Sequence, residues 1–155
     1  VCVCHGVGAD SGGPDSQGGV AGGGAGVPDD RAGDQRRHDN GHLEGDEILK
    51  KIAGAIVSST RKDVDSVFRY GGDEFAVILP EADRETAFKV AQRIREAVNS
   101  AEYFPITASI GLATFEPGIS IYDFVRRADE ALYRSKFKGG NSVSIYEDIR
   151  PEVGG

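Results

Sequence analysis

Apolar side chains recur at helical spacing in three segments, residues 41–59, 83–100 and 120–140, and each segment is predicted to be a helix. Asp83 is expected to be the N-cap of the second helix, and a pair of glycines ends the third. The helical faces comprise Leu49, Ile52, Ala53 and Ile56 in the first, Phe88, Ala91, Ile94 or Arg95, and Val98 in the second, and Phe124, Val125, Ala128, Ala131, Leu132 and Ser135 in the third.

Four shorter runs have the composition or the alternation of β-strands. Gly71 and Gly72 separate the first two runs, and two glycines at this place predict a hairpin, because tight turns need positive φ. The third run alternates large apolar residues with small or polar ones and is predicted to be a half-buried strand. From residue 41 the predicted order is helix, strand, strand, helix, strand, helix, strand. The four runs are residues 65–70, 74–80, 105–115 and 142–147.

A helix that precedes a hairpin in an α/β sandwich normally follows a strand that pairs with the hairpin. A mixed sheet of four or five strands with helices packed on one face therefore needs a further, central strand, which we expect within residues 25–38. That segment contains Pro28 and two glycines and is poor strand material. The predicted fold is an α/β sandwich of the α+β kind with a poorly formed first strand.

Residues 1–40 differ in composition from the rest of the chain. They hold half of its 22 glycines and no Leu, Ile, Phe, Tyr, Lys, Glu or Thr, so they cannot bury enough apolar surface to offset their ordering entropy. We interpret them as a disordered, Gly-rich segment, with residues 1 to about 25 poorly ordered. A folded domain over residues 41–148 and a tail over residues 149–155 are expected to follow.

A second interpretation of the N-terminal segment is translation out of frame. The chain of 155 residues contains no methionine. One possible coding of Val-Pro-Asp-Asp, residues 27–30, reads Phe-Leu-Met-Ile after a shift of one nucleotide, which would make a buried strand. The source nucleotide sequence would test this hypothesis.

The formal net charge of −7 argues against a nucleic-acid polymer as partner, because phosphate backbones are held by clustered Lys and Arg. There is no run of about 18 apolar residues and no signal-peptide pattern, so we expect a cytoplasmic protein without a membrane segment. Cys2 and Cys4 are one residue apart, which is not the spacing of a zinc knuckle or a redox pair.

The predicted hairpin tip carries Asp73 and Glu74 directly after Gly71 and Gly72. Acidic residues in a turn are most often solvated, and this interpretation would prevail for an Asp-Glu pair alone. Adjacent glycines, however, let the phosphates of a ligand approach the backbone, and carboxylates hold Mg²⁺, which itself binds phosphate. This combination indicates nucleotidyl transfer, which depends on positioning and on neutralising phosphate charge.

The segment "RYGGDEFAVILP" resembles the signature of the GGDEF family, the diguanylate cyclases of bacterial signalling. Three further segments, "GHLEGDEIL", "ITASIGLAT" and "RADEALYRSKFKGGN", are similar to other motifs of that family and follow in the family's order. The resemblance implies a ferredoxin-like fold related to the nucleotidyl cyclases. It also implies a homodimer that condenses two GTP molecules into cyclic di-GMP and two pyrophosphates.

The resemblance also implies roles for individual residues. Asp73 and Glu74 would bind Mg²⁺, and Gly71 with Gly72 would let the GTP phosphates lie close to the hairpin. Asp46 matches an aspartate that accepts hydrogen bonds from guanine, and Lys136 matches a lysine that contacts the distal phosphates. Without the family, Asp46 and Lys136 would be interpreted as charges that complement the dipoles of their helices.

The sequence also departs from the family pattern. No apolar first strand carries the family's metal-binding Asp, and Arg37 and His38 stand where the family has Asn-Asp. Gly140 replaces a phosphate-binding Arg, and Lys62 replaces the Arg of a product-inhibition pair that would end at Asp65. Two hypotheses follow: an active cyclase, or a non-catalytic domain, which is either a degenerate nucleotide-binding or regulatory module or a damaged translation product that keeps only part of the fold. An Asp on the first strand would favour the enzyme.

Overall fold

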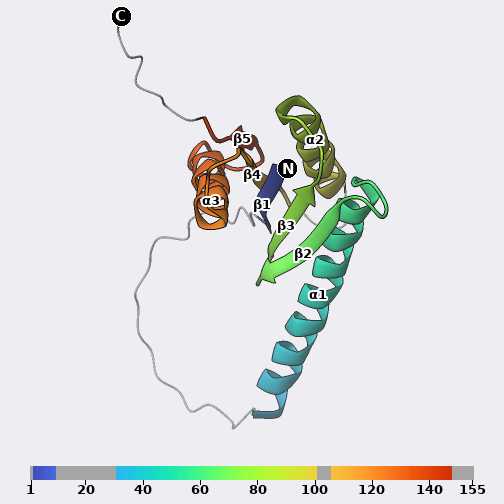
Figure 1. Cartoon of the computed structure of the whole chain (residues 1–155). Coiled ribbons are helices and arrows are strands. Elements are labelled where there is room, and N and C mark those ends of the chain that lie inside the picture. Colours follow the sequence, from blue (N-terminus) through green and yellow to red (C-terminus); the bar gives the residue numbers. More distant parts are fainter. Residues whose placement is uncertain (1, 10–30, 101–105, 148–155) are drawn as a thin grey trace, which may run out of the picture.

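The computed structural model describes residues 2–9, 31–100 and 106–147, and it describes side chains within these ranges from Gly45 onward. A five-stranded sheet with the order β2-β3-β1-β4-β5 forms its centre (Figure 1). All neighbouring strands are antiparallel except β4 and β5, which are parallel. The strands are β1 (Cys2–Ala9), β2 (Ser66–Gly71), β3 (Glu74–Leu79), β4 (Ala108–Thr114) and β5 (Val143–Ile145).

Helices cover both faces of this sheet (Figure 1). The helices α1 (Arg31–Ser58) and α2 (Arg84–Asn99) share the main core with one face, whereas α3 (Ile121–Phe137) packs on the other face. The prediction that the helices lie on one face was therefore wrong. The three helical segments were predicted correctly, and the buried residues of α2 and α3 include most of the predicted face residues.

The central strand comes from a part of the chain where the sequence did not predict it. We expected the strand within residues 25–38 and disorder up to about residue 25, but Cys2–Ala9 form β1, and α1 begins at Arg31. β1 pairs with β3 and β4 at the same time, so Cys2 lies opposite both Leu79 and Thr114. Backbone hydrogen bonds to two neighbours compensate for weak strand propensity. The remainder of the expected disordered segment, residues 10–30, lies outside the described residues.

β4 is buried on both faces, not half-buried as predicted, and every residue from Ala108 to Ala113 is buried. The small residues that alternate with the large apolar ones along β4 face α3 and not solvent. A β-carbon built at Gly111 would collide with the backbone of α3 at Ala128 and Leu132, and it would lie 2.7 Å from Leu132 Cα. Glycine at this position therefore allows α3 to approach the sheet closely.

The helix ends agree with the local signals. Asp83 is the N-cap of α2, as predicted, and its side chain accepts a hydrogen bond of 2.7 Å from the backbone N–H of Thr86. After α3, Gly139 and Gly140 have φ values of +104° and +74°, and the N–H of Gly140 donates to the carbonyl of Ser135. Within the described part of the chain, none of the helices is long and apolar enough to cross a membrane.

Candidate functional site

The β2–β3 hairpin places the candidate residues at the end of the sheet. Gly71 pairs with Glu74, so Gly72 and Asp73 form the turn, and Gly72 has φ of +51°. Arg69 Nε donates a hydrogen bond of 2.9 Å to the carbonyl of Gly72. A β-carbon at Gly71 or Gly72 would meet nothing within 4 Å. The backbone at both glycines is therefore unobstructed, and the approach of phosphates that the sequence analysis expects there stays a prediction.

Consecutive residues of β3 point to opposite faces of the sheet, and this alternation divides the site in two. Glu74 lies on the face that α3 covers, whereas Phe75 lies on the face that α1 and α2 cover and is buried. Each of these residues lines a separate cavity. The turn with Asp73 therefore stands between two hollows on opposite sides of the sheet.

The cavity on the α3 side has a volume of about 340 Å³ and brings Glu74 together with Lys136. Glu74 is half-buried, whereas Lys136 is exposed in the last turn of α3. The sequence analysis missed Asp129 and Tyr133 in this wall, although their spacing from Lys136 on one helix face could have indicated them. The lining residues are Tyr70, Glu74, Asp129, Leu132, Tyr133 and Lys136.

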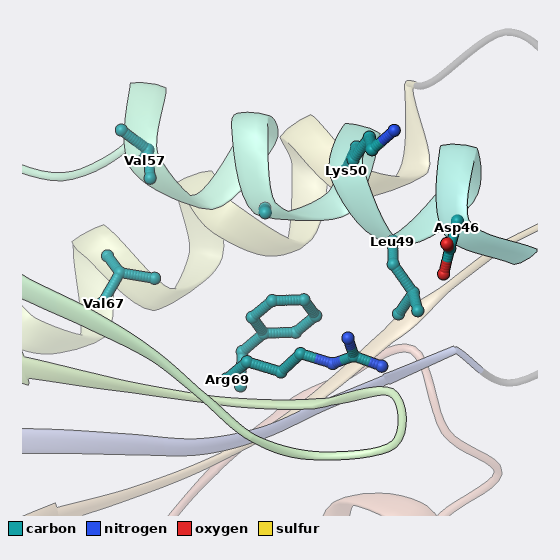
Figure 2. Close-up of a pocket in the computed structure, with 8 residues that line it drawn as sticks. Asp46, Leu49, Lys50, Val57, Val67 and Arg69 are labelled. Atoms are coloured by element: carbon teal, nitrogen blue, oxygen red, sulfur yellow. The ribbon is translucent and has the colours of Figure 1, made fainter.

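The cavity on the α1 side has a volume of about 450 Å³ and contains Asp46, whose side chain is exposed. Figure 2 shows Asp46 on α1 and Arg69 on β2 extending toward the space between the helix and the hairpin. Apart from Lys50, the rest of the cavity is lined by apolar residues. The sequence analysis did not identify Arg69, because nothing local places it opposite α1. The lining residues are Asp46, Leu49, Lys50, Ala53, Val57, Val67, Arg69 and Phe75.

Among the described residues, no group of three or more His, Cys, Asp or Glu side chains forms a metal site. Asp73 and Glu74 supply two adjacent carboxylates beside an open glycine backbone. Mg²⁺ usually keeps water ligands and is held by one or two carboxylates together with substrate phosphates. The two residues therefore fit a magnesium ion that arrives with a nucleotide, and not an all-protein metal cage.

Two ion pairs flank the hairpin region. Lys50 Nζ lies 2.9 Å from Glu47 Oε1 at the rim of the α1-side cavity, and this hydrogen bond holds the pKa of Glu47 below its usual value. Asp65 is paired with Arg61 and not with Lys62. Arg61 Nη2 donates to Asp65 Oδ1 at 2.7 Å, and the backbone N–H of Arg61 donates to Asp65 Oδ2 at 2.7 Å. Burial raises the pKa of Asp65, but the hydrogen bonds from Arg61 outweigh burial and leave this pKa below its usual value.

The model of the family described as "Diguanylate cyclase, GGDEF domain" matches residues 36–142. The chain is 39% identical over 114 residues to diguanylate cyclase DosC of Escherichia coli strain K12, covering 69% of this chain and 25% of DosC. It is 40% identical over 116 residues to diguanylate cyclase DgcM of the same strain, covering 71% of this chain and 28% of DgcM. The chain thus spans about a quarter of the length of these curated relatives.

Solved structures of the same class superpose on the chain. The active GGEEF domain of a diguanylate cyclase from Vibrio cholerae has a TM-score of 0.68 at 26% identity, covering 95% of this chain and 82% of that one. The GGDEF domain of DgcB from Caulobacter crescentus, in complex with c-di-GMP, has a TM-score of 0.67 at 27% identity, covering 95% of this chain and 79% of that one.

The fold and the family match identify the same class of domain. The chain belongs to the GGDEF family. The predicted family and the α+β fold class are thereby confirmed. Diguanylate cyclases of this family generally use a divalent metal ion.

Proposed function

We propose that the chain contains the cyclase domain of a bacterial diguanylate cyclase, which condenses two GTP molecules into cyclic di-GMP. The 3′-hydroxyl of each GTP attacks the α-phosphate of the other. Two phosphodiester bonds form, two α–β anhydride bonds break, and two pyrophosphates leave. Because each domain presents one GTP, the reaction requires a homodimer, and because its substrate is a nucleoside triphosphate we place it in the cytoplasm.

One observation carries this proposal: the same hairpin borders a largely apolar cavity that contains the carboxylate of Asp46 and a second cavity that contains two carboxylates and a lysine. A nucleotide has one apolar, hydrogen-bonding end and one polyanionic end. In the α1-side cavity, Leu49 and Phe75 would contact the faces of the base. Asp46 would accept from the N1–H and N2–H₂ groups of guanine, which lie side by side.

On the α3 side, the triphosphate would lie along the open backbone of Gly71 and Gly72. Asp73 and Glu74 would hold Mg²⁺, which supplies charge neutralisation at the phosphates when bound. Lys136 would contact the distal phosphates as a compact positive charge. The carboxylates thus orient the metal-bound end of the nucleotide while the α1-side cavity holds its base.

A catalytically degenerate, nucleotide-binding or regulatory module is the second candidate, and β1 favours it. The strand Cys2–Ala9 contains no Asp or Glu that could join the two hairpin carboxylates. Gly140 also stands where the family has a phosphate-binding Arg, as described above. Such a module would still bind the base in the α1-side cavity and the phosphates on the α3 side, but it would stabilise the transition state of the reaction less.

Isothermal titration of the purified chain with GTP and Mg²⁺ tests nucleotide binding, and chromatographic detection of cyclic di-GMP in the same mixture tests turnover. ATP and chelated Mg²⁺ serve as controls. Binding with turnover supports the cyclase, and binding without turnover supports the degenerate module. A chain that binds GTP no better than ATP, or equally well without Mg²⁺, would overturn the assignment of this site.

A further inference from the structure

Arg69 projects from β2 into the α1-side cavity (Figure 2), and a hydrogen bond from its Nε atom holds the side chain in place. Its partner across the hairpin is Phe75, whose ring lines the same cavity. Nε donates to the carbonyl of Gly72 at 2.9 Å, which ties the guanidinium to the turn at the residue with positive φ. No described residue accepts a hydrogen bond from the two Nη atoms, so their N–H donors remain available to a ligand.

The charged groups around this cavity differ in what they can offer a ligand. Asp46 is an acceptor only, and Arg69 is a donor only. Lys50 also lines the cavity, but its ammonium group is engaged 2.9 Å from the carboxylate of Glu47. The cavity therefore presents one free acceptor group and one anchored donor fork around an apolar lining.

Guanine carries the complementary pattern on adjacent edges. Its N1–H and N2–H₂ groups donate, and its O6 and N7 atoms accept side by side, which matches the two parallel donors of a guanidinium. We propose that Arg69 is a specificity-determining residue that donates to O6 and N7 of guanine while Asp46 accepts from N1 and N2. This inference rests on the proposed function, since it adds a second contact to the base of the nucleotide assigned to this cavity.

The same arrangement rejects adenine. Adenine has a donating amino group where guanine has O6, and it has an acceptor where guanine has N1–H. The donor Arg69 would therefore meet a donor, and the acceptor Asp46 would meet an acceptor. The bond from Nε to Gly72 also lowers the entropy that the side chain loses on binding, because the guanidinium is ordered before the base arrives.

The wild-type chain allows a test without any mutation. Affinities for GTP, 7-deaza-GTP and inosine triphosphate are measured by titration in Mg²⁺. Because 7-deaza-GTP lacks only the N7 acceptor, we expect it to bind on the order of tenfold more weakly than GTP, the loss typical of a charge-assisted hydrogen bond. Inosine triphosphate, which lacks the N2 amino group, tests the Asp46 contact separately. Equal affinities for GTP and 7-deaza-GTP would overturn the role of Arg69.

Variants then assign the effect to one side chain. Arg69→Ala should bind GTP more weakly and lose the preference for GTP over 7-deaza-GTP, but it should keep the preference for GTP over inosine triphosphate. Arg69→Lys keeps the charge without the fork and should recover at most part of the preference. Lys50→Ala, the matched control, removes a positive charge from the same cavity and should leave the preference intact.

The outcomes separate this inference from the function on which it rests. If Arg69→Ala keeps the full preference for GTP over 7-deaza-GTP, or Lys50→Ala loses it as well, the inference is wrong while GTP binding stands. If the wild-type chain fails to bind GTP, the proposed function fails and this inference with it. Circular dichroism of each variant establishes that the comparison is made between folded proteins.

Discussion

Replacing Gly111 with alanine tests how α3 is seated against the sheet. The added β-carbon would collide with backbone atoms of Ala128 and Leu132, and no side-chain rotation can remove a collision with helix backbone. Overpacking of a core usually lowers the free energy of unfolding by about 1–3 kcal/mol. We expect a loss near the upper end, about 3 kcal/mol, because the whole helix must move. This is a large part of the roughly 5–15 kcal/mol that stabilises a domain.

The matched control is Gly54→Ala on α1. A β-carbon at Gly54 meets nothing within 4 Å, and the residue lies in a helix. The same substitution should therefore raise the free energy of unfolding, by about 0.5–1 kcal/mol, because alanine loses less backbone entropy in a helix than glycine. One substitution type thus has opposite expected effects at two positions.

Urea unfolding followed by circular dichroism measures both variants against the wild type, with the slope compared to check that the unfolded states are equivalent. In thermal unfolding, a loss of about 3 kcal/mol corresponds to a decrease in Tm of roughly 10 °C for a domain of this size. A Gly111→Ala variant within about 0.5 kcal/mol of the wild type would refute the close approach of α3 to β4. Since α3 carries Lys136, the variant should also bind GTP more weakly.

Three further predictions concern the hairpin, the Arg61–Asp65 pair and turnover. Replacing Asp73 and Glu74 together by alanine should abolish nucleotide-dependent Mg²⁺ binding and leave the fold intact, because a hairpin tip contributes little to the core; unchanged GTP affinity in Mg²⁺ would exclude the metal role. Because the pKa of Asp65 lies below its usual value, the stabilisation that it provides is present at neutral pH and is lost as the pH falls below about 4. Asp65→Asn should therefore lower the free energy of unfolding at pH 7, and urea unfolding at several pH values should show this difference shrinking in acid; a constant difference would refute the reasoning. Although the domain is of the cyclase type, the chain as it stands should bind GTP and make little or no cyclic di-GMP, which is the outcome of the degenerate module, since one lost charged contact typically lowers the rate on the order of 10²-fold. A variant that combines an apolar first strand carrying the Asp with Arg37→Asn and Gly140→Arg should restore turnover. The new Arg would occupy a backbone with φ of +74°, which lowers the free energy of unfolding by about 1–2 kcal/mol. Robust turnover by the unmodified chain would show that another residue completes the metal site.

Much of the local structure could be predicted from the sequence. The 3.6-residue period identified the segments that become α1, α2 and α3, and the N-cap at Asp83 is present as expected. The glycines before Asp73 and Glu74 predicted the hairpin. These features depend on residues a few positions apart, so each can be read before the chain folds.

The sequence patterns gave wrong predictions where the burial or the order of a segment depended on which other segments pack against it. Small residues on one side of β4 indicated a solvent face, but they are small because α3 lies against them, as Gly111 shows. The Gly-rich composition of the N-terminal segment indicated disorder, yet Cys2–Ala9 form the central strand, because two neighbouring strands offer backbone hydrogen bonds on both sides.

The residues of the candidate site also divide into what the sequence predicted and what only the packing of the fold decided. The sequence by itself named Asp46, Glu74 and Lys136 through their motifs, and it could not say which of them share a cavity. The tertiary structure decided that Glu74 shares a cavity with Lys136 and that Asp46 shares one with Arg69. The physical reason is the pleat of β3, which sends successive side chains to opposite faces of the sheet, together with the helices that cover each face. Contacts between residues far apart in the chain exist only after those helices have packed.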